Sequence, residues 1–258
     1  MITSTSNDKI KLIHALQTQR RAREKEQLFV VEGVRLAEEA LHARAAVQLV
    51  LHTDTLDPRG RAVINQLARL GASIEAVTPA VMAAVSADQT PPGLLLVLPF
   101  LTPKFQLPAP LSFVLVLDRI GDPGNLGAMF RTADAAGVEA VFLAPGTVDA
   151  YNPKVVRAAM GAHFHVPLVQ VNWETLTARL EGMKVWLAEA NEGLPYHQVD
   201  WRAPSALLIG SEAEGPSQAA LQFATGRVHI PMPGRAESLN AAVAAGILMF
   251  EVAKQRAP

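Results

Sequence analysis

The spacing of apolar side chains in the first hundred residues indicates alternating helices and strands. Ile10, Ile13 and Leu16 recur at helical spacing, directly after the polar residues 6–8, which offer side chains that can cap a helix. Residues 28–31 form an apolar run typical of a buried strand, and residues 34–41 return to helical spacing. The alternation of strand and helix continues through the apolar segments 47–51, 64–70, 73–77 and 94–98. This half of the chain is therefore expected to form a small α/β domain.

A proline-rich stretch separates this half from the next. Residues 99–110 contain four prolines in twelve positions. Proline restricts φ and lacks a backbone donor, so the stretch favours an extended connector over a helix or a strand. We therefore predict a first domain at 1–98, a linker at 99–111 and a second domain at 112–258.

The second half opens with a different pattern, a fully apolar run at 113–117. Such a run is typical of a parallel strand that is covered on both faces. Helical and strand patterns alternate from there to a long terminal helix, expected from Ser238 to about Lys254. This order predicts an α/β fold with a parallel sheet, whose ligands usually bind beyond the carboxyl ends of the strands.

Composition narrows the class of protein. Half of the residues are hydrophobic and 18% are charged, as in a well-packed globular protein. The apolar runs are far shorter than the roughly 20 residues of a membrane span, and no apolar signal segment is visible. The absence of cysteine excludes disulfides, zinc–thiolate sites and cysteine nucleophiles. A cytoplasmic enzyme or binding protein is expected.

Positive charge is concentrated near the N-terminus, although the net charge of the chain is −1. Residues 1–25 carry six basic and two acidic side chains, a local charge of +4. Such a stretch either binds RNA phosphates or forms a solvated helix face. The candidate RNA-binding residues are Lys9, Lys11, Arg20, Arg21 and Arg23.

The segment 117–137 is the first of three with candidate chemistry. A turn at 122–124 follows the strand, Asn125 is expected to cap a helix, and Gly137 is expected to end it. Arg131 lies within that helix among small and apolar residues. A guanidinium in such surroundings usually meets a phosphate or a carboxylate.

The second segment is 206–216, where a buried strand ends at Gly210. A glycine there would let a ligand approach the backbone, and Pro216 is expected to open a helix. Neither a G-x-G-x-x-G fingerprint nor a P-loop occurs in the chain, which disfavours a nicotinamide-dependent dehydrogenase.

The third segment is 228–251, in which a strand leads through a loop into an alanine-rich helix. Ser238 is expected to cap this helix. Asn240 would then lie in its first turn, where asparagine is a poor helix former, so its amide is free to bond outside the helix.

A pair of histidines, His163 and His165, could suggest a metal site. They alternate around Phe164, which favours a strand edge over metal ligation.

Together the three segments resemble the SpoU (TrmH) family of RNA ribose 2′-O-methyltransferases of the SPOUT superfamily. The family motifs N-x-G-x-x-x-R, G-x-E-x-x-G and I-P-M-x-G…S-L-N appear in order within residues 112–254. Residues 7–11, 28–33 and 90–93 are similar to the RNA substrate-binding domain found in this family. The sequence departs from many relatives at Ala159 and Ala242, where those relatives have serine.

The resemblance implies methyl transfer from S-adenosylmethionine to a ribose 2′-hydroxyl of RNA. The expected substrate is 23S ribosomal RNA, and transfer RNA is the alternative substrate. A catalytically inactive RNA-binding protein of the same fold is the alternative from another class. The family also implies a homodimer and a deep trefoil knot in the C-terminal domain. No metal is expected, because the sulfonium of the donor already activates the methyl group and the sequence shows no metal-ligand cluster.

Residue roles follow from the same resemblance. The expected catalytic residues are Asn125, Arg131, Glu212, Ser238 and Asn240. The expected cofactor-binding residues are Leu208, Gly210, Ile230, Met232, Ser238, Leu239 and Asn240. The family assigns Arg131 to activation of the hydroxyl, but an arginine pKa above about 12 makes a phosphate-holding role the better expectation.

Overall fold

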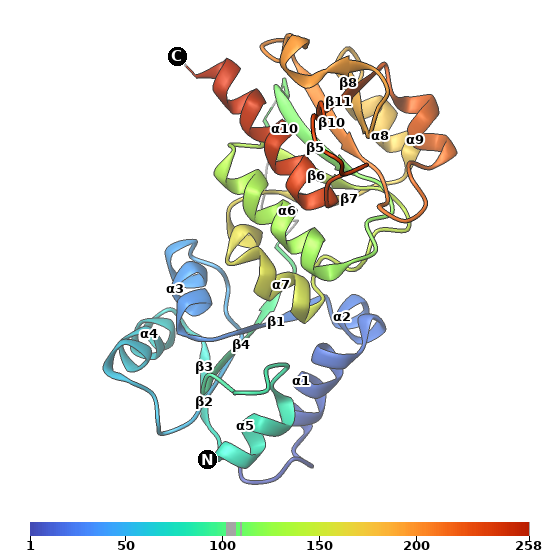
Figure 1. The fold of residues 1–258 in the computed structure, drawn as a ribbon. Coiled ribbons are helices and arrows are strands. Elements are labelled where there is room, and N and C mark those ends of the chain that lie inside the picture. Colours follow the sequence, from blue (N-terminus) through green and yellow to red (C-terminus); the bar gives the residue numbers. More distant parts are fainter. Residues whose placement is uncertain (102–106, 109, 258) are drawn as a thin grey trace. The chain divides into compact units, whose positions relative to one another are not determined.

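The computed structural model describes residues 1–101, 107–108 and 110–257. The chain divides into two compact units, one of Met1–Pro103 with Asp149–Phe164, the other of Lys104–Val148 with His165–Pro258. Figure 1 labels their elements. Residues 102–106 and 109, half of the proline-rich stretch whose conformation we predicted as extended, lie outside the described residues.

The first unit contains a four-stranded mixed sheet in the order β1-β4-β2-β3. β4 (Leu94–Pro99) pairs antiparallel with β1 (Leu28–Glu32) and with β2 (Leu49–His52), and β2 pairs parallel with β3 (Ser73–Ala76). β4 is central and almost wholly buried, which explains the unbroken apolar run that predicted it.

Helices pack against this sheet. Ile10, Ile13 and Leu16 of α1 enter the core, as their spacing predicted, and the side chain of Asn7 caps that helix by accepting from the Lys9 N–H. Pattern reasoning did not identify α2 and α5. The helices preceding residue 104 are α1 (Asp8–Thr18), α2 (Arg20–Glu26), α3 (Val34–His42), α4 (Pro58–Arg69) and α5 (Pro79–Val85).

Residues 149–164 also pack in the first unit, although they lie within the range 112–258 that we assigned to the second domain. They contain α7 (Pro153–Ala159), which contacts β1, and the short 3-10 helix η2 (Ala162–Phe164). The ring of Tyr151 stacks on Phe100 with centroids 4.0 Å apart.

The histidine prediction was wrong, because His163 lies in η2 and not on a strand. Its Nε2 is 2.7 Å from the carbonyl oxygen of Ala150, and burial lowers the pKa of the imidazole to about 4. Among the described residues no group of three or more metal-ligating side chains occurs.

The second unit contains a seven-stranded sheet in the order β7-β6-β5-β10-β8-β11-β9, and every adjacent pair is parallel. The predicted parallel sheet is therefore confirmed. Its central strands are fully buried because helices cover both faces. The strands are β5 (Phe113–Leu117), β6 (Ala140–Leu143), β7 (Leu168–Gln170), β8 (Lys184–Glu189), β9 (Leu194–Pro195), β10 (Ser205–Ile209) and β11 (Gly226–His229).

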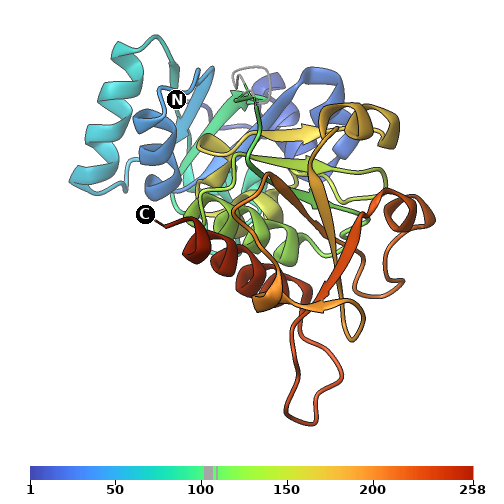
Figure 2. The ribbon, with the colours of Figure 1, turned by 90° about the horizontal axis from the view of Figure 1, so that it is seen from above.

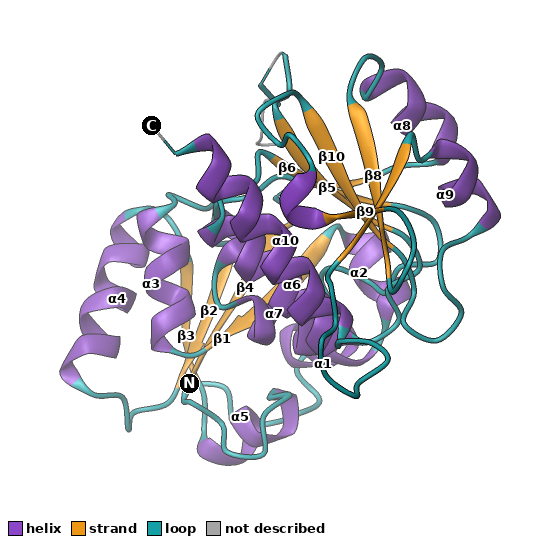
Figure 3. Cartoon of the chain, turned by 45° about the horizontal axis from the view of Figure 1, so that its top comes forward, coloured by secondary structure: helices purple, strands orange, loops and turns teal. Residues whose placement is uncertain are grey.

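Figure 3 shows α8 (Trp173–Arg179) and α9 (Gln218–Phe223) on one face of this sheet, with α6 (Pro123–Ala135) and α10 (Ala241–Arg256) on the other. The α8–α9 face has its own apolar core with β5, β6, β8 and β10. On the opposite face α6 and α10 pack directly against each other. Among the described residues no helix is long and apolar enough to cross a membrane.

Three expected helix starts are shifted. α6 is capped by Asp122, not Asn125, because Pro123 occupies the first helical position, where a missing N–H costs nothing. Asn240, not Ser238, caps α10. Ser217 caps α9, so Pro216 precedes that helix and does not open it.

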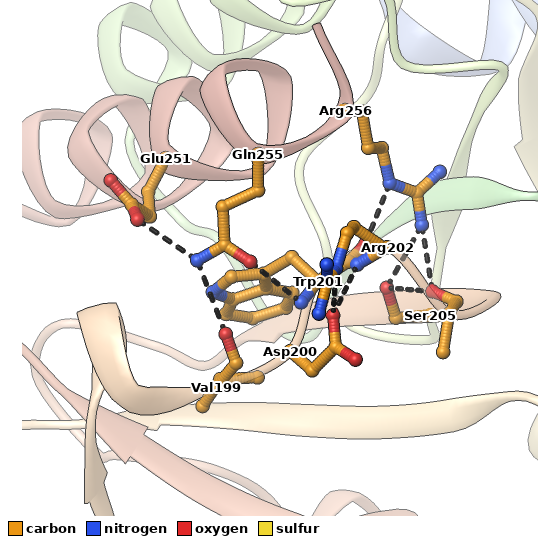
Figure 4. A network of polar contacts seen from close by, with 9 residues as sticks. Val199, Asp200, Trp201, Arg202, Ser205, Glu251, Gln255 and Arg256 are labelled. Carbon is orange, nitrogen blue, oxygen red and sulfur yellow. Dashed lines mark hydrogen bonds and ion pairs between the residues drawn. The ribbon is translucent and has the colours of Figure 1, made fainter. Parts of the chain in front are cut away.

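The C-terminal end of α10 is anchored by a polar network (Figure 4). The guanidinium of Arg256 donates to the carbonyl oxygens of Trp201 and Ala203 at 2.7 and 2.8 Å. Gln255 accepts from the Trp201 N–H at 3.0 Å and donates to the Val199 carbonyl at 3.1 Å. These bonds hold the last turn of α10 against the loop that precedes β10.

Candidate active site

Three loops meet at the carboxyl ends of the parallel strands β5, β10 and β11 of the second unit. They are the turn before α6, the loop 210–217 after β10, and the loop 230–240 between β11 and α10. Figure 2 shows the chain after β11 as a long loop that extends from the sheet before it returns to α10. These are the three segments in which the sequence places its motifs.

A carboxylate joins the three loops. Oε1 of Glu212 accepts from Nδ2 of Asn125 at 2.5 Å and from the Ala241 backbone N–H at 3.0 Å. Nδ2 of Asn240 lies 3.4 Å from the same oxygen and donates to Oδ1 of Asn125 at 3.0 Å. The negative charge of Glu212 also lies at the N-terminus of α10, where the helix dipole favours it.

The amide of Asn240 is fixed on both sides. Its Oδ1 accepts from the backbone N–H groups of Ala242 and Val243 at 3.0 and 3.2 Å, so the side chain caps α10. Its Nδ2 is then directed at Asn125 and Glu212. An asparagine that is unfavourable inside a helix is thus favourable here, one position before the helix begins.

A pocket of about 470 Å³ adjoins this network. Its size is that of a site for a small organic ligand. The walls are mainly apolar, and the carboxylates of Glu189 and Glu212 provide negative charge. The lining includes most of the residues predicted to bind a cofactor, namely Gly210, Ile230, Met232, Ser238, Leu239 and Asn240.

Leu208 differs from the other predicted cofactor residues. Its side chain is fully buried in the core beneath α8 and α9 and does not line the pocket. Ile209, the next residue of β10, lines it instead. The reason is the twofold alternation of side chains along a strand, which places neighbours on opposite faces of the sheet.

Gly210 lines the pocket, but its lack of a side chain serves the packing of the loop. A Cβ atom there would lie 2.9 Å from both the backbone nitrogen and the Cα of Pro216. Neither backbone atom can move without shifting the start of α9. The absence of a side chain at Gly210 therefore also has a packing reason within the protein, and the prediction that a ligand approaches its backbone stays a prediction.

Sequence reasoning missed the part of the pocket that comes from neighbouring strands and from α10. Glu189 ends β8, which lies beside β10 in the sheet. A polar residue at the carboxyl end of a parallel strand was the available signal. The missed lining residues include Glu189, Ala190, Val228, Ala244 and Leu248.

Two predicted catalytic residues do not join the Asn125–Glu212–Asn240 network. Ser238 is exposed in the loop and lines the pocket. Arg131 is exposed on α6 and has no hydrogen-bond or ion-pair partner among the described residues. Its guanidinium is accessible to a ligand from solvent.

The predicted RNA-binding residues all lie on α1 and α2 of the first unit. Four are exposed, although Lys9 pairs with Glu75 and Arg20 pairs with Glu24. The placement of Arg23 does not support its predicted role, because its side chain is only 3% exposed and forms an ion pair with Asp149 at 2.7 Å.

Two family models and a characterised relative match this chain. Residues 112–250 match the family model described as "SpoU rRNA Methylase family", and residues 7–96 match the "MRM3-like substrate binding domain". The chain is 37% identical over 253 residues to the 23S rRNA (guanosine(2553)-2'-O)-methyltransferase RlmP of Bacillus subtilis, covering 97% of this chain and 98% of that protein.

Solved structures show the same fold. The SpoU methyltransferase AviRb of Streptomyces viridochromogenes, in complex with AdoMet, has a TM-score of 0.89 at 28% identity, covering 97% of this chain and 98% of that one. The AdoMet-bound rRNA methyltransferase of Sinorhizobium meliloti has a TM-score of 0.85 at 28% identity, covering 98% and 97%. The resemblance seen in the motifs is confirmed, and this protein belongs to the SpoU rRNA methylase family of RNA methyltransferases.

Proposed function

We propose that this protein transfers the methyl group of S-adenosylmethionine to a ribose 2′-hydroxyl of 23S ribosomal RNA. The observation that carries the proposal is the pocket that adjoins the Asn125–Glu212–Asn240 network. It combines a binding site for a small ligand with polar groups from all three family motifs. The matches to an rRNA methylase family and to a 23S rRNA 2'-O-methyltransferase favour ribosomal RNA over transfer RNA.

The residues present fit this donor. Apolar side chains such as Ile230 and Leu239 suit the faces of an adenine, and the backbone of Gly210, which lines the pocket, suits its polar edge. The carboxylates of Glu189 and Glu212 suit a positively charged sulfonium. When bound, the donor supplies a methyl group that is already activated by the sulfonium charge.

The chain itself must hold the acceptor hydroxyl in line with the methyl group, because a ribose hydroxyl is barely ionised at neutral pH. As the new O–C bond forms, the hydroxyl proton passes to solvent water, to which the site residues are exposed. Asn125 and Asn240 orient the ribose or phosphate of the target at the edge of the pocket. Glu212 holds the side-chain amides of both asparagines in place. Arg131 holds a phosphate of the target through its forked donors and stabilises the developing alkoxide. Arginine is not the base in this scheme, since a guanidinium stays protonated in proteins.

We assign RNA binding to the first unit, whose residues 7–96 match a substrate-binding domain. Lys9, Lys11, Arg20 and Arg21 provide exposed positive charge there. We assign RNA binding to residues 1–98 and catalysis to residues 112–258, with a linker at 99–111. Residues 149–164 belong to the catalytic range in sequence, although they pack in the first unit. A ribosomal RNA substrate makes the cytoplasm the expected place of action.

We further propose a homodimer, and a trefoil knot in the second unit as family membership implies. Support for a dimer comes from α10, where Val243 and Phe250 are each 51% exposed. Seven residues apart, they lie on one face of the helix. Light scattering should give twice the mass of the 27.6 kDa chain, and Val243→Asp with Phe250→Asp should reduce it to one chain. A single-chain mass for the unaltered protein would contradict the dimer.

The reaction is tested by mapping 2′-O-methyl groups in RNA from a deletion strain and its parent. One 23S nucleotide should lose its methyl group in the deletion strain and regain it when purified protein and S-adenosylmethionine are added. If the lost methyl group lies in transfer RNA, transfer RNA is the substrate and 23S ribosomal RNA is not. No lost methyl group, together with no binding of S-adenosylhomocysteine, would favour an inactive RNA-binding protein.

A further inference from the structure

The loop 210–217, which carries Glu212, is tied to the end of β5 by a buried carboxylate. Asp118 directly follows that strand and is fully buried. Its Oδ2 accepts from the Ser217 backbone N–H at 2.7 Å. The hydroxyl of Ser217 in turn accepts from the Ala220 N–H at 3.1 Å and caps α9. Asp118 therefore fixes the point at which the loop ends.

Arg119, the next residue, holds the middle of the same loop. Its Nη1 pairs with Oε2 of Glu214 at 2.9 Å, and its Nη2 donates to the Gly215 carbonyl oxygen at 3.2 Å. The aliphatic part of Arg119 lies over Gly146, where a Cβ atom would come within 2.9 Å of the Arg119 Cγ. The side chain of Arg119 thus contacts the loop after β6 through its aliphatic part and the loop after β10 through its guanidinium.

This arrangement is costly for the folded chain. Arg119 has a φ of 56°, a left-handed conformation that is uncommon outside glycine. Nε of Arg119 and Oδ1 of Asp118 are buried and have no hydrogen-bond partner among the described residues. Backbone strain and unpaired buried polar atoms both oppose folding, and they persist where another requirement holds them. Stability therefore does not account for these two residues.

We propose that Arg119 and Asp118 are positioning residues for methyl transfer, which hold the loop 210–217 so that Glu212 meets Asn125 and Asn240. Neither residue lines the pocket, so both act through the loop. The Arg119–Glu214 ion pair is partly exposed and contributes little by itself. The bonds to the Gly215 carbonyl and the Ser217 N–H restrain the backbone. This inference rests on the proposed function.

The test compares full-length Arg119→Ala with the unaltered protein in three measurements. Hydrogen exchange of residues 211–217 without ligand reports the loop directly. Calorimetry with S-adenosylhomocysteine reports the pocket, and steady-state kinetics separates kcat from KM for RNA. We expect exchange about tenfold faster, product affinity about tenfold lower and a larger fall in kcat, since two charge-assisted bonds are lost. KM for RNA should stay unchanged.

Two further variants distinguish positioning from a general effect on folding. Arg119→Lys keeps the charge but replaces the planar fork of two nitrogens with a single nitrogen, so it should restore part of the loop protection. Glu214→Ala removes only the exposed partner and should speed exchange by about threefold. Arg202→Ala is the matched control, because it breaks the exposed pair with Asp200 in the same unit and should leave all three measurements unchanged.

The inference is overturned if loop exchange in Arg119→Ala and Glu214→Ala matches that of the unaltered protein. It is also overturned if the loop loosens while product affinity and kcat stay unchanged. The proposed function stands in both cases, provided that the unaltered protein binds S-adenosylhomocysteine and methylates RNA. If the unaltered protein does neither, the proposed function fails first and the positioning role fails with it.

Discussion

Arg23 on α2 and Arg131 on α6 differ in burial and in the number of polar partners. Arg23 on α2 is buried in the first unit, where Nε and Nη2 contact Oδ2 of Asp149 at 2.7 Å and Nη1 donates to the Leu16 carbonyl at 2.6 Å. Arg131 on α6 is exposed in the second unit, and the described residues offer it no polar partner. A guanidinium whose donors are used inside the protein has a structural task, whereas one with open donors can bind a phosphate.

The largest expected effect is on catalysis. Arg131→Ala should lower the rate of methyl transfer by roughly a thousandfold, because an oriented donor at a developing charge is lost. Affinity for S-adenosylhomocysteine should change little, since Arg131 does not line the pocket. A tritium-transfer assay beside calorimetry measures both quantities, with Arg179→Ala on α8 as an exposed control. A near-normal rate in Arg131→Ala would remove this arginine from the active site.

The next effect is on stability and concerns the buried arginine. Arg23→Ala should lower the free energy of unfolding by about 3 kcal/mol, because Asp149 would remain as a buried, unpaired charge. Changing both partners, Arg23→Leu with Asp149→Leu, should recover part of this loss. Arg131→Ala should shift the same quantity by less than about 0.5 kcal/mol. Urea denaturation of the three variants measures the free energy of unfolding. An equal loss of this free energy in Arg23→Ala and Arg131→Ala would contradict the structural role of Arg23.

The smallest effect concerns the exposed arginines beside Arg23. Replacing Arg20 and Arg21 with alanine should make the log–log slope of RNA affinity against salt shallower by up to about two, since each lost phosphate contact releases about one counterion less. Arg59→Ala on α4 removes an exposed positive charge outside this stretch and is the control. Binding measured between low and moderate KCl reports the slope. An unchanged slope in the double variant would make the stretch a solvated helix face.

Local patterns in the sequence predicted much of the fold. The apolar run at 113–117 became the buried strand β5, and Ile10, Ile13 and Leu16 became the core face of α1. Both patterns depend only on how side chains repeat along a single helix or strand, so residues close together in the sequence are enough to show them. Helix starts were less predictable, since Asp122 and Asn125 are both capable caps and the position of Pro123 decided between them.

Contacts between distant residues were outside the reach of such patterns. Its place in the basic stretch predicted that Arg23 is exposed like its neighbours. Its partner Asp149 lies 126 residues further along the chain, so no local pattern could indicate that Arg23 is buried. The same contact places residues 149–164 in the first unit. A fragment that starts near Pro108 would therefore lack the residues against which this segment packs. RNA binding by the first unit is better tested by substitutions in the full chain.

The sequence by itself determined the parallel sheet, the family and the candidate residues of the site, because these depend on local periodicity and on short motifs. Only the tertiary structure decided which contacts those residues make. Glu212 meets Asn125 across 87 residues and Asn240 across 28, and Gly210 is required by the backbone of Pro216. The physical reason is that hydrogen bonds and burial depend on proximity in space, and the packing of the sheet brings these distant segments together.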